Sequence, residues 1–248
     1  MIWNSILLIM YIKSNSLNLN YGVTMYRFIL PLLSILLLSS QPLQAEEAIH
    51  ERIEWSDVWI VNANADDRPR VLLVGDSIVK GYYKGVEEAL GEKANCARFA
   101  TSKFLSHPDY LKELGLLVDR FSFDVIHINN GLHGWDYTEV QYKAGLTALF
   151  AWLKEHAPNA KIIWGHSTPV RNSSDSSQFN EERNPRVIER NRIATEAAEA
   201  AGVPVNDLFT LVVDHPDYFV SDGVHFSEAG RAAQAAEVAE KISECLPE

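Results

Sequence analysis

The sequence has little cysteine, and this shortage excludes two classes of protein. Cys96 and Cys245 are the only cysteines among 248 residues, and neither lies in a C-x-x-C pair or in a Cys/His spacing typical of zinc sites. A scaffold held by many disulfides is therefore excluded, and we expect no metal and no cofactor. The sequence leaves open whether Cys96 and Cys245 pair.

Positive charge is also scarce. Lysine and arginine together number 22, against 33 aspartate and glutamate residues, which gives a net charge of −11. Nucleic acids and anionic membrane surfaces select basic patches, so we expect neither as a partner. An acidic surface is typical of a protein whose net charge keeps it in solution.

Long apolar runs are missing beyond the first 45 residues. From Met25 the chain has a basic residue, Arg27, then an apolar run over 28–38 and a polar stretch that ends at a small residue, Ala45. This is the pattern of a secretory signal peptide, so we expect cleavage near Ala45 and export to the periplasm or the extracellular space. The apolar run is shorter than the about 20 residues that span a bilayer. We therefore expect no stable membrane association after cleavage, with an uncleaved anchor as the alternative.

These features divide the chain into three parts. Residues 1–45 are expected to be a leader, in which 1–24 can be interpreted as an upstream start that precedes the true one. Residues 46–69 are expected to be an N-terminal extension. Residues 70–248 have the length of one folded domain.

Short apolar runs alternate with longer amphipathic ones in this domain. Runs that are apolar throughout are typical of parallel strands covered on both faces. Alternation of strands and helices predicts an α/β fold of three layers with right-handed crossovers and a parallel sheet of five strands. The strands are expected at 70–74, 94–99, 123–129, 160–166 and 203–207, and the helices at 84–93, 108–121, 138–158, 184–202 and 227–244.

Residues with reactive side chains follow several of these strands. In open parallel sheets the ligand site lies beyond the carboxyl ends of the strands, where Ser77 follows the first one. A serine hydroxyl needs a base to become a nucleophile, and the base needs a third group to orient it. The late segment "DGVH" offers both, as Asp222 and His225. We therefore predict a Ser77–His225–Asp222 triad, with a helix cap or a phosphate ligand as the alternative roles of Ser77.

Three segments together resemble one family. "VGDSIVKGYY" occurs early, "NNGLHG" in the middle and "DGVHFSEAG" late, and in this order they are similar to the GDSL or SGNH hydrolases, many of which act on acetylated carbohydrates. The resemblance covers the chain from about Val71 onward. It implies a flavodoxin-like three-layer fold without a metal, Ser77 as nucleophile, Asp222 as orienting acid and His225 as base. It also implies that Asp76 shapes the turn rather than acting chemically.

The sequence departs from this family in the groups that would bind the oxyanion. The usual middle block is G-x-N-D, and His133 falls where its asparagine should, with Asn129 and then Asn130 as rivals. The block after the second strand lacks its usual glycine. A backbone N–H of Thr101 or Ser102 is expected to replace it, because an oxyanion hole needs the donor and not the residue type.

The remaining predictions concern the substrate. Tyr82 and Trp135 are aromatic residues near the expected cleft that suit a glycan, and His166 follows the fourth strand, where it could line the cleft. His127 lies inside a strand and is expected to be a core histidine. The polar stretch 171–185 is expected to border the substrate site.

Taken together, the sequence predicts a serine esterase that hydrolyses short-chain esters, with acetyl on a carbohydrate as the expected substrate. Two alternatives stay open. One is a glycan-binding module on a catalytically weakened esterase scaffold, and the other is a flavodoxin-like cofactor-binding protein.

Overall fold

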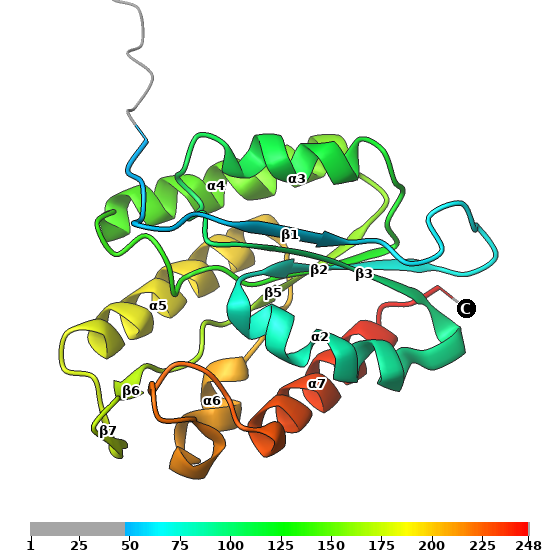
Figure 1. The fold of residues 1–248 in the computed structure, drawn as a ribbon. Helices are drawn as coiled ribbons and strands as arrows, with labels where there is room; N and C mark the ends of the chain where they lie inside the picture. Colours follow the sequence, from blue (N-terminus) through cyan, green and yellow to red (C-terminus); the bar gives the residue numbers. More distant parts are fainter. Residues whose placement is uncertain (1–47, 248) are drawn as a thin grey trace, which may run out of the picture. The chain divides into compact units, whose positions relative to one another are not determined.

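A six-stranded sheet forms the centre of the protein, in a computed structural model that describes residues 48–247 (Figure 1). The expected leader and its cleavage point at Ala45 lie outside the described residues. The strands lie in the order β1-β3-β2-β4-β5-β8. Their bounds are β1 Ser56–Trp59, β2 Arg70–Gly75, β3 Asn95–Thr101, β4 Val125–Ile128, β5 Lys161–Gly165 and β8 Val205–Asn206.

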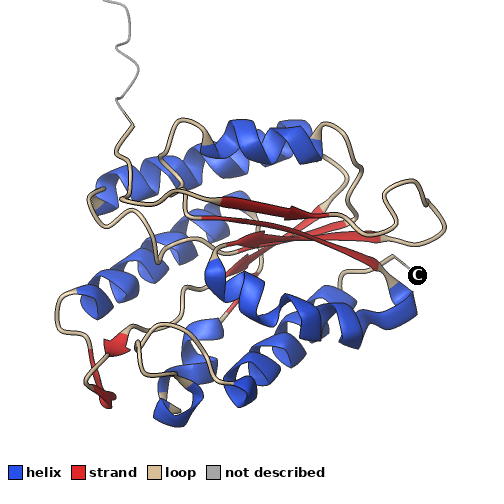
Figure 2. Cartoon of the chain, in the orientation of Figure 1, coloured by secondary structure: helices blue, strands red, loops and turns tan. Residues whose placement is uncertain are grey.

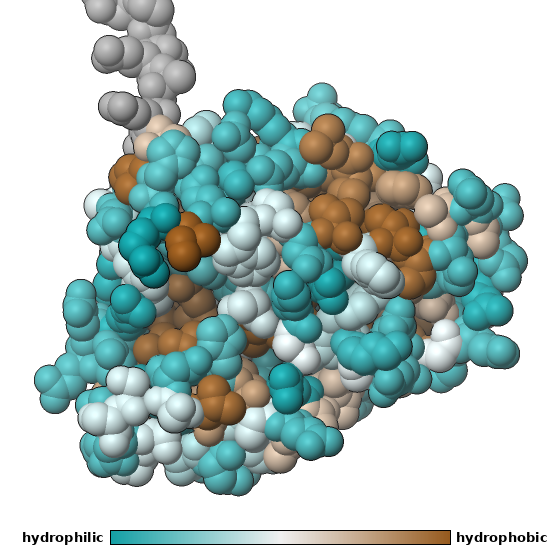
Figure 3. Space-filling view, viewed as in Figure 1, coloured by the Kyte–Doolittle hydropathy of each residue, from teal (hydrophilic) through white to brown (hydrophobic). Residues whose placement is uncertain are grey.

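The five predicted strands are present and parallel, but the sheet is one strand wider than predicted. The additional strand, β1, pairs antiparallel with β3, with Ser56 opposite Thr101. It comes from the N-terminal extension, which therefore adds an edge to the sheet. β1 is more exposed than the inner strands, and its apolar residues Val58 and Trp59 are 50% and 56% exposed. Figure 3 shows apolar side chains gathered among hydrophilic ones on the face viewed there.

Alternate side chains of β2 pack into two separate cores. Val71 and Leu73 face one core, and Leu72 and Val74 face the other, all with no exposed surface. A strand with helices on both faces buries both sets of side chains, which explains its uninterrupted apolar sequence. The chain thus forms the predicted three layers, with helices on either side of the sheet (Figure 2).

The helices of the two outer layers bury their apolar side chains in different cores, one on each face of the sheet. One core is formed with α2, α6 and α7, and the other with α3, α4 and most of α5. No helix among residues 48–247 is long and apolar enough to cross a membrane. The bounds are α2 Ser77–Leu90, α3 Tyr110–Val118, α4 Glu139–His156, α5 Arg183–Ala201, α6 Leu208–Val213 and α7 Glu228–Ser243.

Besides β1, the sequence did not predict a hairpin, a short helix and a 3₁₀ turn. The polar stretch after β5 contains a two-stranded hairpin, β6 Arg171–Asn172 with β7 Asp175–Phe179. Helix α6 follows β8, and Asp207 caps its N-terminus by accepting the N–H of Thr210. A 3₁₀ turn at Pro216–Tyr218 then leads to the loop before α7.

The two cysteines do not pair. Cys96 is buried in β3, Cys245 is partly exposed beyond α7, and both are free thiols. The fold is therefore held by its two apolar cores rather than by a covalent link.

Candidate active site

The turn after β2 presents Ser77 at the start of a helix. Asp76 caps α2 by accepting the N–H of Ile78 at 2.8 Å, so Ser77 is the first helical residue rather than the cap. Gly75 permits the tight turn, because a Cβ there would lie 2.1 Å from Val79 Cγ2 and 3.2 Å from the Asn129 carbonyl. The sequence thus places a hydroxyl at the carboxyl edge of the sheet and at the positive end of a helix dipole.

Asp222, His225 and Ser77 form a continuous chain of hydrogen bonds. His225 Nδ1 lies 2.7 Å from Asp222 Oδ2, and His225 Nε2 lies 2.8 Å from Ser77 Oγ. The Asp222 carboxylate also accepts the backbone N–H groups of Val224 and His225 at 2.8 Å each. Burial would raise the pKa of Asp222, but these hydrogen bonds outweigh it and hold the pKa below its ordinary value. An ionised Asp222 keeps the proton of His225 on Nδ1 and leaves Nε2 free to accept one from Ser77.

The loop that carries Asp222 and His225 is fixed by the hairpin after β5. Arg171 donates its backbone N–H to the carbonyl of Gly223 at 2.7 Å. Gly223 has a φ of +73°, and a Cβ there would lie 2.3 Å from the Arg171 carbonyl oxygen. A glycine is therefore required between the acid and the base.

A pocket of about 760 Å³ opens over this chain of hydrogen bonds. Ser77, Asp222 and His225 line it together with His133 and Trp135. Glu182 and Arg183 also line it, at the end of the stretch 171–185 that was expected to border the substrate site. A larger pocket of about 920 Å³ lies at the amino ends of β5 and β8, but it contains no serine and no histidine.

A buried acid lies beneath the nucleophile. Asp76 is 1% exposed, and its Oδ2 has no hydrogen-bond partner among the described residues. Burial raises the pKa of Asp76, although the positive charge of His133 opposes that effect. Asp76 thus shapes the turn, as the resemblance implied, and it also lies close enough to His133 for their charges to interact.

The three side chains predicted to bind the oxyanion lie in different places. Asn129 donates from Nδ2 to the Gly165 carbonyl at 2.9 Å, and Asn130 donates from Nδ2 to the Lys103 carbonyl at 3.0 Å. Both are buried and neither lines the pocket, whereas His133 does. Among these three, only His133 faces the space where a substrate would bind.

Thr101 and Ser102 are covered by the N-terminal extension. The N–H of Ser102 donates to the Trp55 carbonyl at 3.1 Å, so it is not free for the predicted role of oxyanion donor. The Thr101 hydroxyl donates to the same carbonyl at 3.0 Å and accepts the N–H of Lys103 at 3.1 Å, but these contacts do not test the role predicted for its backbone N–H. The unpredicted strand β1 accounts for this difference, because it begins beside the end of β3 and occupies the polar groups there.

Only one of the three predicted substrate contacts lines the pocket. Trp135 does, and the guanidinium groups of Arg183 and Arg190 lie 5.1 and 4.8 Å from its ring centroid. Tyr82 is 1% exposed in the core behind α2, a position that does not support a substrate contact. His166 lies outside the pocket, where it hydrogen-bonds with Asp207 and Thr195 at 3.1 and 3.0 Å.

Residues 48–55, here called the N-terminal strap, were not predicted to contribute to the site. His50, Glu51 and Arg52 of the strap line the pocket together with Ser77. Glu51 contacts His133 Nδ1 at 2.9 Å and accepts the N–H of Gly134 at 2.8 Å. No short motif carries this contact, since Glu51 and His133 lie 82 residues apart.

A buried arginine supports the loop that carries His133. Arg190 of α5 has no exposed surface and donates to the carbonyls of Gly131, His133 and Gly134 at 2.8, 2.9 and 3.1 Å. Glu139 Oε1 lies 3.4 Å from its Nε. Burial lowers the pKa of Arg190 to about 10, so the side chain is still a cation at neutral pH.

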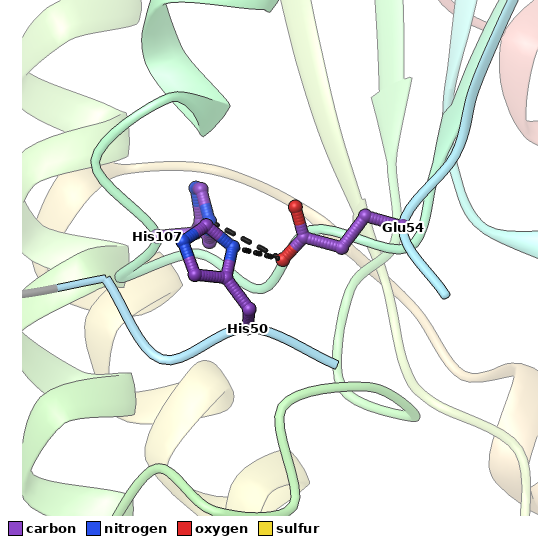
Figure 4. Close-up of side chains that lie close together, drawn as sticks. All are labelled: His50, Glu54 and His107. Atoms are coloured by element: carbon purple, nitrogen blue, oxygen red, sulfur yellow. Dashed lines mark hydrogen bonds and ion pairs between the residues drawn. The ribbon is translucent and has the colours of Figure 1, made fainter. Parts of the chain in front are cut away.

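The strap is clamped by a second group of ionisable side chains (Figure 4). His50 Nδ1 and His107 Nε2 lie 2.9 and 3.4 Å from Glu54 Oε1. Histidine and glutamate are zinc ligands, so the cluster raises the question of a metal. However, His107 Nδ1 accepts the N–H of Asp109 at 3.1 Å, which puts the proton of the neutral ring on Nε2. A metal would need the lone pair of that nitrogen, so the cluster fits an electrostatic clamp, with one hydrogen bond between His50 and Glu54, better than a metal site.

Comparison with known proteins decides the family. Residues 73–233, more than half of the chain, match the model of the GDSL-like Lipase/Acylhydrolase family. The chain belongs to this family. Members are ester-bond hydrolases, and this chain is therefore a hydrolase of that class rather than a flavodoxin-like cofactor protein. No curated protein matches the chain.

Solved structures show that the fold is shared. A lipase/acylhydrolase from Enterococcus faecalis is 21% identical, with a TM-score of 0.58, and the match covers 72% of this chain and 97% of that one. The M. smegmatis aryl esterase is 16% identical with a TM-score of 0.60, covering 72% and 100%. An acetyl xylan esterase is 17% identical with a TM-score of 0.55, covering 70% and 99%. At these identities the similarity shows the SGNH hydrolase fold alone.

Proposed function

We propose that this protein is an exported serine esterase in which Ser77, His225 and Asp222 form the catalytic triad. The observation that carries the proposal is the chain of hydrogen bonds from Asp222 to His225 at 2.7 Å and from His225 to Ser77 at 2.8 Å. Such a chain activates a serine hydroxyl, and it opens into a pocket large enough for an ester.

The reaction follows from the positions of the protons. Ser77 Oγ attacks the ester carbonyl while its proton moves to His225 Nε2, and Asp222 stabilises the resulting imidazolium. The tetrahedral intermediate collapses, the C–O bond to the alcohol breaks, and His225 returns the proton to the leaving oxygen. Water then attacks the acyl-enzyme by the same route and releases the acid.

The oxyanion needs donors that are free of other partners. The first N–H groups of a helix have no partner within it, so the amide of Ser77 at the start of α2 is one candidate. His133 is the other, since it lines the same pocket as Ser77.

The proposed substrate is an acetylated carbohydrate. Arg52, Asp136, Glu182 and Arg183 at the pocket lining supply donors and acceptors that suit a polyhydroxylated alcohol, and Trp135 adds an aromatic surface. The signal-like pattern that ends at Ala45 supports export, which would bring the enzyme to polymers outside the cell.

The direct test is hydrolysis of an aryl acetate by the wild type and by Ser77→Ala. We expect the substitution to lower kcat by at least about 10³-fold while circular dichroism stays unchanged. Equal rates for the two proteins would contradict the triad. Released acetate measured over acetylated sugars and polysaccharides then tests the alcohol, and retained binding without turnover would favour a glycan-binding module instead.

A further inference from the structure

Glu51 connects the N-terminal strap to His133. Among the three side chains predicted to bind the oxyanion, His133 alone lines the pocket. Its Oε2 lies 2.9 Å from His133 Nδ1, and its Oε1 accepts the N–H of Gly134 at 2.8 Å. Both carboxylate oxygens are thus committed to the loop that carries His133. A carboxylate held in two places fixes the imidazole ring against the pocket wall, in the way that buried acids orient histidines elsewhere.

The second ring nitrogen of His133 is free. Nε2 has no hydrogen-bond partner among residues 48–247, and the ring lines the pocket together with Ser77. With Nδ1 donating to Glu51, a neutral ring would present only a lone pair at Nε2, which cannot bind an oxyanion. The imidazolium carries a proton on both nitrogens, so only the charged form can donate from Nε2.

The surroundings of His133 favour the charged form. Burial alone would lower the pKa of His133, but the hydrogen bond that it donates to Glu51 and the charges of Asp76 and Glu51 outweigh it, so the pKa is raised. Burial would raise the pKa of Glu51, yet its bonds with His133 and Gly134 lower it, which agrees with an ion pair.

We propose that Glu51 is a positioning residue that holds His133 as an imidazolium, whose Nε2–H stabilises the oxyanion formed when Ser77 attacks the ester. This inference rests on the proposed function and adds the strap to the machinery of the site. A charged imidazolium forms a stronger hydrogen bond with an oxyanion than a neutral amide does. This compensates for the donors lost because the side chains of Asn129 and Asn130 lie outside the pocket.

Two substitutions on the same strap separate this role from a structural one. Glu51→Gln keeps the size of the side chain and its carbonyl oxygen but removes the charge, and Glu54→Gln is the matched control in the clamp with His50 and His107. For an aryl acetate at pH 8 we expect Glu51→Gln to lower kcat on the order of 10- to 100-fold with KM within about twofold. Glu54→Gln should leave kcat unchanged.

The pH profile gives a second readout. His133 must be protonated to donate, so the alkaline limb of kcat should move to lower pH in Glu51→Gln. Asp76, Arg183, Arg190 and His225 also lie around this region, and the lining of the pocket adds the charged residues Arg52, Asp136, Glu182 and Arg186. All of them are retained in the variant. NMR titration of the His133 ring should show the same fall in pKa without requiring turnover.

The outcomes distinguish the two proposals. An unchanged kcat and pH profile in Glu51→Gln, with Ser77→Ala inactive, would overturn the role of Glu51 and leave the triad standing. An unchanged His133 titration would also overturn it, whatever the rates. Wild-type turnover that does not depend on Ser77 would overturn both. The last variant is His133→Phe, which should lower kcat as Glu51→Gln does. The double variant with Glu51→Gln should have the same kcat as His133→Phe alone.

Discussion

Two carboxylate–imidazole pairs line the same pocket, and they are built in opposite ways. Asp222 and His225 lie three residues apart on one loop, with side chains that are 50% and 47% exposed. Glu51 and His133 lie 82 residues apart, with side chains that are 29% and 21% exposed. The first pair is local and open to water, and the second is assembled from distant segments and largely covered.

This difference corresponds to the chemistry that each pair can perform. A general base must gain and lose a proton in every cycle, and the His225 ring lies between the Asp222 carboxylate and the Ser77 hydroxyl, where it can do so. An electrophile must keep its charge throughout, and the Glu51 carboxylate favours that charge on His133 against the opposing effect of burial. The roles that we propose for the two histidines thus differ because their surroundings differ.

The largest expected effect comes from breaking the local pair. Asp222→Asn preserves the shape of the side chain but lets the His225 ring adopt the other tautomer, so we expect kcat to fall about 10⁴-fold with the fold intact. Stopped-flow or steady-state turnover of an aryl acetate measures this change. A loss no greater than that of Glu51→Gln would show that the two pairs are not functionally distinct.

The next effect concerns the support of the distant pair. Arg190→Met keeps the length and apolar contacts of the side chain but leaves the carbonyls of Gly131, His133 and Gly134 without their donor. We expect the free energy of unfolding to fall by about 3 kcal/mol, because buried polar groups lose their partner. Urea titration measures it.

The matched control lies on the same helix. Arg192 is exposed and pairs with Glu189 and Glu196 on the surface, so Arg192→Met should change the urea midpoint little. Equal midpoints for the two variants would mean that Arg190 does not hold the loop that carries His133.

The smallest effect comes from a histidine that has no carboxylate partner. His127 in β4 has no exposed surface, and burial lowers its pKa to about 4. The unfolded chain binds a proton there near pH 6.5 and the folded chain does not, so stability is lost as pH falls from about 6.5 towards 4. Between pH 7 and 4.5 we expect the wild type to lose about 2 kcal/mol more than His127→Gln. Parallel urea titrations at the two pH values decide this, and equal losses would contradict it.

The sequence predicts most of this fold because its inner strands are uniform. Strand β2 is apolar at every position between Arg70 and Gly75, and helix α4 carries its cap, Thr138, directly before it. Strand β1 gave no such signal, because an edge strand with exposed side chains needs no apolar alternation. The hairpin after β5 is polar for the same reason.

The residues of the candidate site divide in the same way, into those that a local sequence pattern predicts and those that it does not. Ser77, Asp222 and His225 lie in two short motifs, one directly after β2 and one in the loop before α7, and the fold brings the two together. Glu51 lies in a segment that looks like a linker, directly before the strand β1 that pairs with β3, and it contacts His133 from there. Contacts of that kind arise from tertiary structure, which no local pattern encodes. The same pairing explains why the amide of Ser102 is occupied by Trp55.

The extension that forms β1 has a practical consequence for work with this enzyme. The match to the family begins at residue 73 and stops at 233, which includes Ser77, Asp222 and His225. A clone trimmed to that span would still be recognised by every motif, yet it would lack Glu51, the sheet edge and the last ten residues of α7. The stretch that matches the family is therefore shorter than the stretch that must be expressed. An inactive product from the trimmed clone would not show that the full enzyme is inactive.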